Sequence, residues 1–328
     1  MSENSVGGTR NDGSGSSDGI DSSDGPGATG RLGRRLAVER LSSYWLGGAG
    51  YFAVGLFVLV VAVLTYQSLP ILAAYPLSEL LLSSNWDPAA NEFGFLPAIV
   101  GTLYVTALSM TMGAPIAILA AVYVAEYATG RTKTIVSTFV DVLAAIPSVI
   151  FGLVALVVVV PFVGDYLAPA VGADTTGLGI LTVSLVMAIV VTPFIISLSV
   201  ESLEALPDEL RESSLGIGAT RWETVRSVLL RAAGPGIFSA VLLGFGRVFG
   251  ATIVPAMLIG GQTQLPDSVF STGQTLPTLV VNDFGELMSL PLTQSALIFV
   301  GLLLVVVVWL FNFGAALVRR RLQRRWQY

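Results

Sequence analysis

The 328-residue chain contains no cysteine and no histidine. Without cysteine there is no disulfide, no thiol catalysis and no thiolate metal site. Without histidine the chain lacks the commonest general base and the commonest metal ligand, which excludes Ser-His-Asp chemistry. We therefore expect no catalytic residue, no metal site and no cofactor.

Charged side chains are scarce as well. They make up 12% of the chain, whereas hydrophobic residues make up 53% and the mean hydropathy is +0.77. Because soluble domains carry about 25% charged residues, this composition is typical of a membrane protein. It predicts an all-α integral membrane protein that contacts membrane lipid, and we expect no nucleic-acid partner.

The N-terminal stretch has little apolar content. Residues 1–30 are rich in serine and glycine and hold five acidic residues against one arginine, Arg10. Such a segment cannot bury enough apolar surface to fold. We predict a disordered, acidic, cytoplasmic tail over residues 1–45 and a transmembrane domain over residues 46–328.

Six segments are long and apolar enough to cross a hydrocarbon core, which takes roughly 20 residues. They are residues 50–69, 97–125, 135–163, 177–200, 236–260 and 294–317. The second and third are interrupted at Pro115 and Pro147. We interpret each of these two as one bent span, because the basic turn with Arg131 and Lys133 then fits between them.

Apart from Arg247, lysine and arginine are confined to alternate loops. They precede the first segment, follow the last, and lie between the second and third and between the fourth and fifth. Residues 70–96, 164–176 and 261–293 contain neither. Because basic loops stay on the inner side, we predict a multi-pass protein of the cell membrane with both termini in the cytoplasm.

The loop over residues 201–234 is dense in charges of both signs. Pro207 and the acids after it are typical of a helix start, and Gly218 is typical of a stop. Thr220 and Glu223 have the spacing of a capping box for a second helix. The pattern predicts a helix, a glycine turn and a helix on the inner membrane face. It is either a plain interfacial connector or a docking surface for another protein.

The run LRESSLGIGATRWETVRSVLL in this loop resembles the cytoplasmic loop of binding-protein-dependent ABC importer permeases. That family's motif is Glu-Ala-Ala, three residues, glycine, nine residues and Ile-x-Leu-Pro; here Arg231 stands where the proline is usual. The runs NWDPAANEFGFLPAIVGTLYVTALSM, AIPSVIFGLVAL and GFGRVFGAT are similar to the phosphate-specific, PstC-like branch.

The resemblance implies a six-helix ABC type I importer permease with the MetI-like fold, whose core covers about residues 97–317. It also implies three kinds of partner: two copies of a cytoplasmic ATP-binding subunit, a second, PstA-like permease and an extracellular phosphate-binding protein. The loop's first helix would insert into a groove of the ATPase. The coupling positions carried over are Arg211, Glu212, Ser213, Ser214, Gly218 and Arg221.

The chain has no GxxxxGK[ST] phosphate loop, since its only lysine follows Thr132. We therefore expect a transport subunit that is not itself an enzyme and takes its energy from a partner or an ion gradient.

Arg247 is the one basic residue inside a predicted span. A charge at that depth normally faces a polar path or a partner. The alternatives are a translocation role and an internal pair with Asp141. In the PstC-like pattern an acid follows at the position of Ala251, so Asp141 is a candidate substitute.

Three hydroxyl side chains are further candidates for the translocation path. Ser148, Thr192 and Thr252 lie beside prolines or next to the Arg247 segment. The alternative for each is a hydrogen bond to a carbonyl of its own helix.

The resemblance, together with these observations, predicts a permease subunit of an ATP-driven importer for inorganic phosphate. Sulfate, molybdate and tungstate are alternative cargoes. An ion-coupled secondary transporter is a further alternative, but the spans offer only Asp141 for coupling and show no clear inverted repeat. A scaffold protein would leave Arg247 without a purpose.

Overall fold

The computed structural model describes residues 27–287 and 290–325. It divides into two units, residues 1–59 and 60–328. In the first unit the described residues form the N-terminal part of helix α1 (Gly27–Ala74). Residues 27–45 are thus helical, although we predicted them to belong to the disordered tail. Residues 1–26 of that predicted tail lie outside the described residues.

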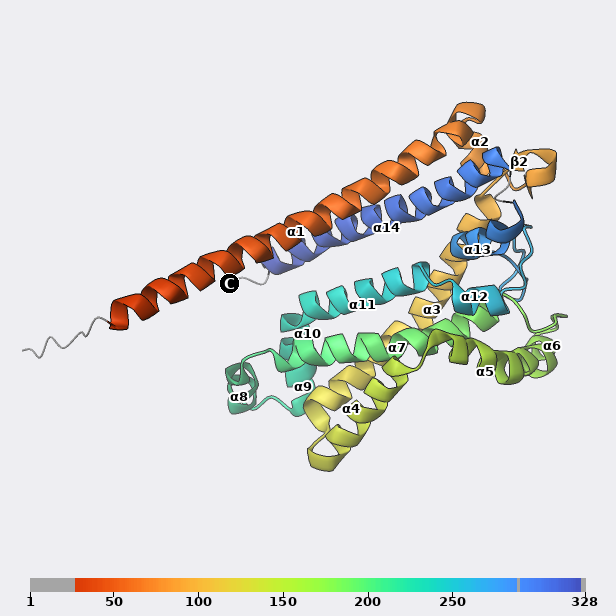
Figure 1. Cartoon of the computed structure of the whole chain (residues 1–328). Coiled ribbons are helices and arrows are strands. Elements are labelled where there is room, and N and C mark those ends of the chain that lie inside the picture. Colours follow the sequence, from red (N-terminus) through yellow and green to blue (C-terminus); the bar gives the residue numbers. More distant parts are fainter. Residues whose placement is uncertain (1–26, 288–289, 326–328) are drawn as a thin grey trace, which may run out of the picture. The chain divides into compact units, whose positions relative to one another are not determined.

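The second unit is built almost entirely from helices, as the composition predicts (Figure 1). After α1 come α2 (Leu77–Leu82), α3 (Leu96–Val122), α4 (Gly130–Ala145), α5 (Ser148–Pro161), α6 (Ala168–Ala170), α7 (Ile180–Glu204), α8 (Asp208–Gly216), α9 (Arg221–Thr224), α10 (Leu230–Ala232), α11 (Gly234–Phe249), α12 (Ile253–Leu258), α13 (Leu276–Leu287) and α14 (Pro291–Arg325). Short turns of other helix types are η1 (Pro88–Ala90), η2 (Tyr123–Tyr127), η3 (Phe162–Leu167) and η4 (Val225–Leu229). Strands β1 (Trp86–Asp87) and β2 (Glu92–Phe93) form an antiparallel pair.

Five helices among the described residues are long and apolar enough to span a membrane. They are Gly47–Ala74, Leu96–Tyr127, Ser148–Ala170, Ile180–Glu204 and Pro291–Leu317. A sixth candidate is the pair Arg221–Ala232 and Gly234–Phe249, which is bent by 69°. The first, second, fourth and sixth predicted segments each lie mainly within one of these helices.

The third predicted span is wrong in its bounds. The chain breaks at Ile146 and Pro147, both of which have extended backbone angles. Proline disfavours the helical conformation in the residue before it, so α4 ends there and α5 starts anew. The apolar span is therefore Ser148–Ala170, and α4 is a separate helix before it.

The fifth predicted span, residues 236–260, is a broken helix. Helix α11 has 16 residues, which is about 24 Å of helix and less than the roughly 30 Å of a hydrocarbon core. The chain leaves the helix at Gly250 and resumes in the six-residue α12. The non-helical backbone at Gly250–Thr252 thus lies directly after the turn that carries Arg247.

Helix α7 lies at the centre of the main core and packs against α3, α4, α5 and α11 (Figure 1). Two glycines permit these close contacts. A Cβ on Gly113 of α3 would lie 3.0 Å from the Ala188 carbonyl oxygen of α7. A Cβ on Gly244 of α11 would lie 2.9 Å from the Ile195 side chain of α7. Larger residues at either glycine would force α7 and its neighbour apart.

A second core closes the end of the unit that carries β1 and β2. It combines Phe93 and Phe95 with side chains from α1, α2, α13 and α14. The Trp86 ring lies 5.4 Å from that of Phe95, and its indole N–H donates to Asp283 at 2.8 Å. The strand pair is therefore fixed to the ends of the spanning helices.

Candidate functional site: the charged loop and the Arg247 segment

The loop between α7 and α11 has the predicted helix–turn–helix form. Helix α8 starts directly after Pro207, and two acids occupy its first turn, where they complement the helix dipole. The helix ends at Gly216, and Gly218 has a φ of +91°, which disfavours every residue with a side chain. Thr220 and Glu223 form the predicted capping box at the start of α9.

Arg211 of α8 is the hub of this loop. Its Nη2 and Nε donate to the Glu126 carboxylate of η2 at 2.8 and 3.2 Å. The same guanidinium donates to the Leu203 and Leu206 carbonyl oxygens at 2.9 and 3.2 Å, and to Asp208 at 3.2 Å. These bonds join α8 to the end of α3 and to the end of α7.

The hydrogen bond to Glu126 is the main reason that the pKa of Arg211 rises above its usual value. The Arg211 and Glu126 side chains are 21% and 11% exposed, so water screens the pair only in part. The resemblance carried Arg211 over as a coupling position, and its side chain contacts the chain's own helices. Glu126 lies 85 positions away, and no local pattern identifies it as the partner.

A buried hydroxyl pair fastens α8 to α9. The Ser214 and Thr224 side chains are 8% and 3% exposed, and their hydroxyl oxygens lie 3.0 Å apart. Behind them, Val225 and Leu229 are buried against the end of α3. The small size of Ser214 therefore serves packing within the loop.

The capping box orders the second helix. The Glu223 carboxylate accepts from the Thr220 backbone N–H and hydroxyl, both at 2.8 Å. These bonds, led by the one from the backbone, lower the pKa of the Glu223 carboxyl. The acid is therefore charged at neutral pH and holds the start of α9 in place.

The other predicted coupling residues lie on the outside of the loop. Glu212, Ser213, Gly218 and Arg221 are exposed. Ile217 is 87% exposed and Trp222 is 52% exposed. Exposed apolar residues next to a polar rim are typical of a protein-binding surface.

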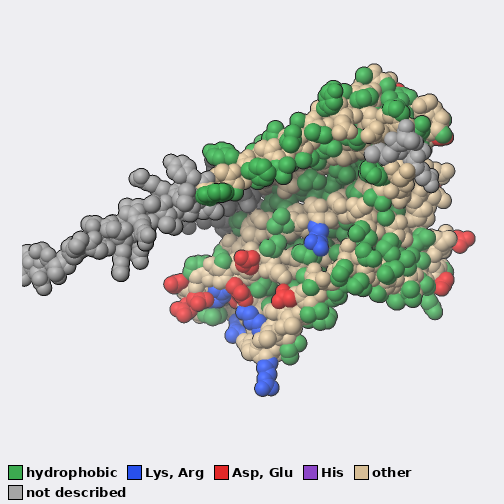
Figure 2. Space-filling view, in the orientation of Figure 1, with side chains coloured by type: hydrophobic (Ala, Val, Ile, Leu, Met, Phe, Trp, Pro, Cys, Tyr) green, Lys and Arg blue, Asp and Glu red, His purple; other side chains and the backbone are tan. Residues whose placement is uncertain are grey.

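Charged side chains gather over the end of the second unit where α4 and α8 lie (Figure 2). Both signs are present there, and Lys133 of α4 pairs with Glu204 of α7 at 2.6 Å. On the visible face, the end that carries α6 shows acidic side chains but no basic ones.

Arg247 lies in the last turn of α11. The guanidinium carbon lies 3.5 Å from the ring centroid of Phe194 on α7. In the part of the chain that the structure describes, no carboxylate lies within 4.0 Å of it and none of its N–H groups donates a hydrogen bond. The alternative of an internal pair with Asp141 is therefore wrong.

The three candidate hydroxyls differ in what they bond. Thr192 donates to the Ala188 carbonyl of its own helix at 2.6 Å, as the alternative for it predicted. Thr252 lies in the break after α11 and makes only a long contact of 3.4 Å with the Gly250 carbonyl. Ser148 is the half-buried first residue of α5.

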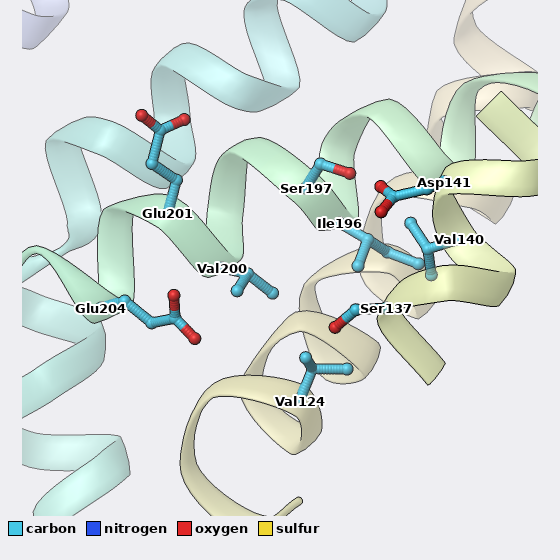
Figure 3. A pocket seen from close by; sticks show the side chains of 9 residues that line it. All are labelled: Val124, Ser137, Val140, Asp141, Ile196, Ser197, Val200, Glu201 and Glu204. Carbon is cyan, nitrogen blue, oxygen red and sulfur yellow. The ribbon is translucent and has the colours of Figure 1, made fainter. Parts of the chain in front are cut away.

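Asp141 lies in a pocket between α4 and α7 (Figure 3). Its carboxylate points toward the Ser197 hydroxyl. Glu201 and Glu204 of α7 also line this pocket, which makes it acidic. The structure thus separates the Asp141 carboxylate from the Arg247 guanidinium and places each in a different environment.

Comparison with known proteins identifies the family. Residues 113–328 match the family model described as the binding-protein-dependent transport system inner membrane component. This match covers more than half of the chain. The chain belongs to this family. It is a multi-pass ABC importer permease.

Three relatives illustrate the similarity. The permease is 36% identical over 235 residues to the probable ABC transporter permease protein YqgH of Bacillus subtilis, covering 71% of this chain and 74% of the relative. It is 32% identical to the phosphate transport system permease protein PstC of Haemophilus influenzae, covering 74% and 81%. It is 28% identical to the probable PstC of Methanocaldococcus jannaschii, covering 78% and 86%.

Solved structures confirm the MetI-like importer fold. A bacterial transporter that imports alginate matches with a TM-score of 0.58 and 18% identity, over 89% of the permease and 99% of that chain. The MetNI methionine transporter matches with a TM-score of 0.55 and 24% identity, over 73% and 99%. At these identities the likeness concerns the fold alone.

Proposed function

We propose that this permease carries inorganic phosphate into the cell as one subunit of an ATP-driven importer. Relatives named as phosphate permeases share 28–32% identity with most of its length. The observation that carries the proposal is Arg247, whose N–H groups have no protein partner in the described residues. A guanidinium presents N–H pairs that match two oxygens of a tetrahedral anion.

The proposed orientation places both termini and the charged loop in the cytoplasm. Its support is the confinement of arginine and lysine to alternate loops. In this orientation β1, β2 and the acidic loops face outward, where an extracellular phosphate-binding protein would deliver the anion. A PstA-like second permease would complete the path, because Arg247 is exposed in the chain taken alone.

Two copies of a cytoplasmic ATP-binding subunit would supply the energy, one of them through α8. The exposed Glu212 and Ile217 would contact its ATP-binding subunit, and Gly218 would keep the turn in shape. Arg211 would transmit the movement, since it joins α8 to the ends of α3 and α7. A rigid connection is required, because a docking helix that slides freely cannot shift the spans.

Within the path, Arg247 would provide the positive charge, and Ser148 and Thr252 would provide hydroxyl groups at helix ends. Thr192 has a smaller part in this scheme, because its hydroxyl already bonds its own helix. Asp141 would lie further toward the cytoplasm, in the acidic pocket with Glu201. Negative charge there would disfavour binding of the phosphate anion at a second site and would promote its release into the cytoplasm.

The test is uptake of labelled phosphate into proteoliposomes that hold the complete importer with its binding protein outside and ATP inside. We expect ATP-dependent phosphate uptake that excess sulfate or molybdate does not inhibit. Uptake of sulfate or molybdate in place of phosphate would assign the permease to another oxyanion. Uptake driven by an ion gradient without ATP would contradict an importer of this type.

A further inference from the structure

We infer that Phe194 is the positioning residue for Arg247, and that it holds the guanidinium by its face so that the N–H edges stay available to the anion. The inference rests on the proposed function of Arg247 in the phosphate path.

The geometry of the contact leaves the donors unused. The guanidinium carbon lies 3.5 Å from the ring centroid, well within the roughly 6 Å over which a cation is attracted to a ring face. The five N–H groups of arginine lie in the plane of the guanidinium. A group that packs its face on a ring therefore keeps these donors directed sideways, and none of them bonds to the described residues.

The choice of a ring in place of a carboxylate has an electrostatic consequence. A carboxylate partner would occupy the same N–H edges that bind an anion and would cancel the charge. The ring holds the cation without doing either. Ala251 stands four residues after Arg247 and offers no charge, and Asp141 lies in the separate pocket. The positive charge of Arg247 thus stays uncompensated in the described part of the chain.

Helix packing explains why the two residues meet. Gly244 lies three residues before Arg247, and Ile195 directly follows Phe194. Because a Cβ on Gly244 would lie 2.9 Å from the Ile195 side chain, α11 approaches α7 closely at this level. Ile195 is fully buried, which fixes the register of α7 against α11. One turn along, the same approach brings the guanidinium over the Phe194 ring.

The decisive experiment changes the electron density of the ring and leaves its shape nearly constant. Phe194 is replaced in the complete importer by mono-, di- and trifluorophenylalanine, each of which weakens the attraction of the ring face for a cation. We expect phosphate turnover at saturating loaded binding protein to fall with each added fluorine. Phe194→Leu should lower turnover roughly 5- to 30-fold, and Phe194→Tyr should retain most of it.

The matched control is the same fluorinated series at Phe151, a half-buried phenylalanine of α5. Turnover there should not depend on the number of fluorines. If phosphate turnover is also independent of the number of fluorines at Phe194, the inference is overturned, even if Phe194→Leu impairs assembly.

A further variant, Arg247→Gln, separates the inference from the proposed function. If Arg247→Gln stops phosphate uptake while turnover does not change with fluorination of Phe194, only the inference fails. If Arg247→Gln transports at the normal rate, Arg247 has no part in the path and the proposed function of this site fails.

Discussion

Two arginines of this permease, Arg211 and Arg247, have opposite surroundings. Arg211 donates to a carboxylate of η2 and to two carbonyl oxygens at the C-terminal end of α7. Arg247 touches a neutral ring and leaves its donors without a partner in the described residues. The first arrangement uses the guanidinium to join helices, and the second keeps it available for a ligand. The surroundings therefore distinguish an arginine whose donors bond the protein itself from one whose donors do not bond the described residues.

The largest effect is expected at Arg247. Arg247→Gln should lower phosphate uptake roughly 10- to 150-fold, because the anion loses its charged hydrogen bonds. Arg247→Lys should lie in between, since an ammonium keeps the charge but loses the planar fork. Uptake by proteoliposomes gives the rate, and co-purification of the partner subunits shows that assembly is intact. Loss of assembly in both variants would make Arg247 a structural residue like Arg211.

The next effect concerns the outer face of the loop. Glu212→Arg reverses a charge on the exposed side of α8, and Gly218→Pro imposes a negative φ where the chain has +91°. Each should lower co-purification of the ATP-binding subunit by about tenfold or more and leave membrane insertion unchanged. Gly172→Pro, at another positive-φ glycine outside the loop, is the control and should bind normally. Normal binding by the two loop variants would remove α8 from the docking surface.

A smaller effect is expected at Arg211. Arg211→Met should destabilise the solubilised permease by about 1–3 kcal/mol, because it leaves the mostly buried Glu126 unpaired. Replacing Glu126 by methionine as well should restore part of the loss. Thermal unfolding measures both, with Arg226→Met on the exposed side as control. If the single and double variants unfold alike, the bonds to the carbonyl oxygens carry the interaction.

The smallest effect concerns the capping box and depends on pH. The pKa of Glu223 is lowered from its usual value near 4.5 by the bonds from Thr220, so its stabilising contribution is present above that value. The contribution is lost as the pH falls through the lowered pKa. Glu223→Gln should therefore unfold at a slightly lower temperature than the wild type at neutral pH, and the difference should vanish once the pH is below the lowered pKa of Glu223. A difference that persists in acid would have another cause.

Much of the fold and of the loop follows from local pattern. Apolar runs, with their turn residues, locate most of the spans, and Pro207, Gly218 and the Thr220 pair define the loop helices. The misplaced third span shows the limit of run length as a signal. The apolar run continues across Pro147, but the backbone at Ile146 is extended, and the span begins after it.

The sequence by itself determined that this is a helical membrane protein with an ordered, charged loop, because hydropathy, capping and glycine conformation act within a few residues. Only the tertiary structure decided that Arg211 pairs with Glu126, that Asp141 lies apart from Arg247, and that Phe194 holds the Arg247 guanidinium. These contacts join residues more than 50 positions apart. They depend on how closely helices approach, which glycines such as Gly244 permit and which no local pattern records.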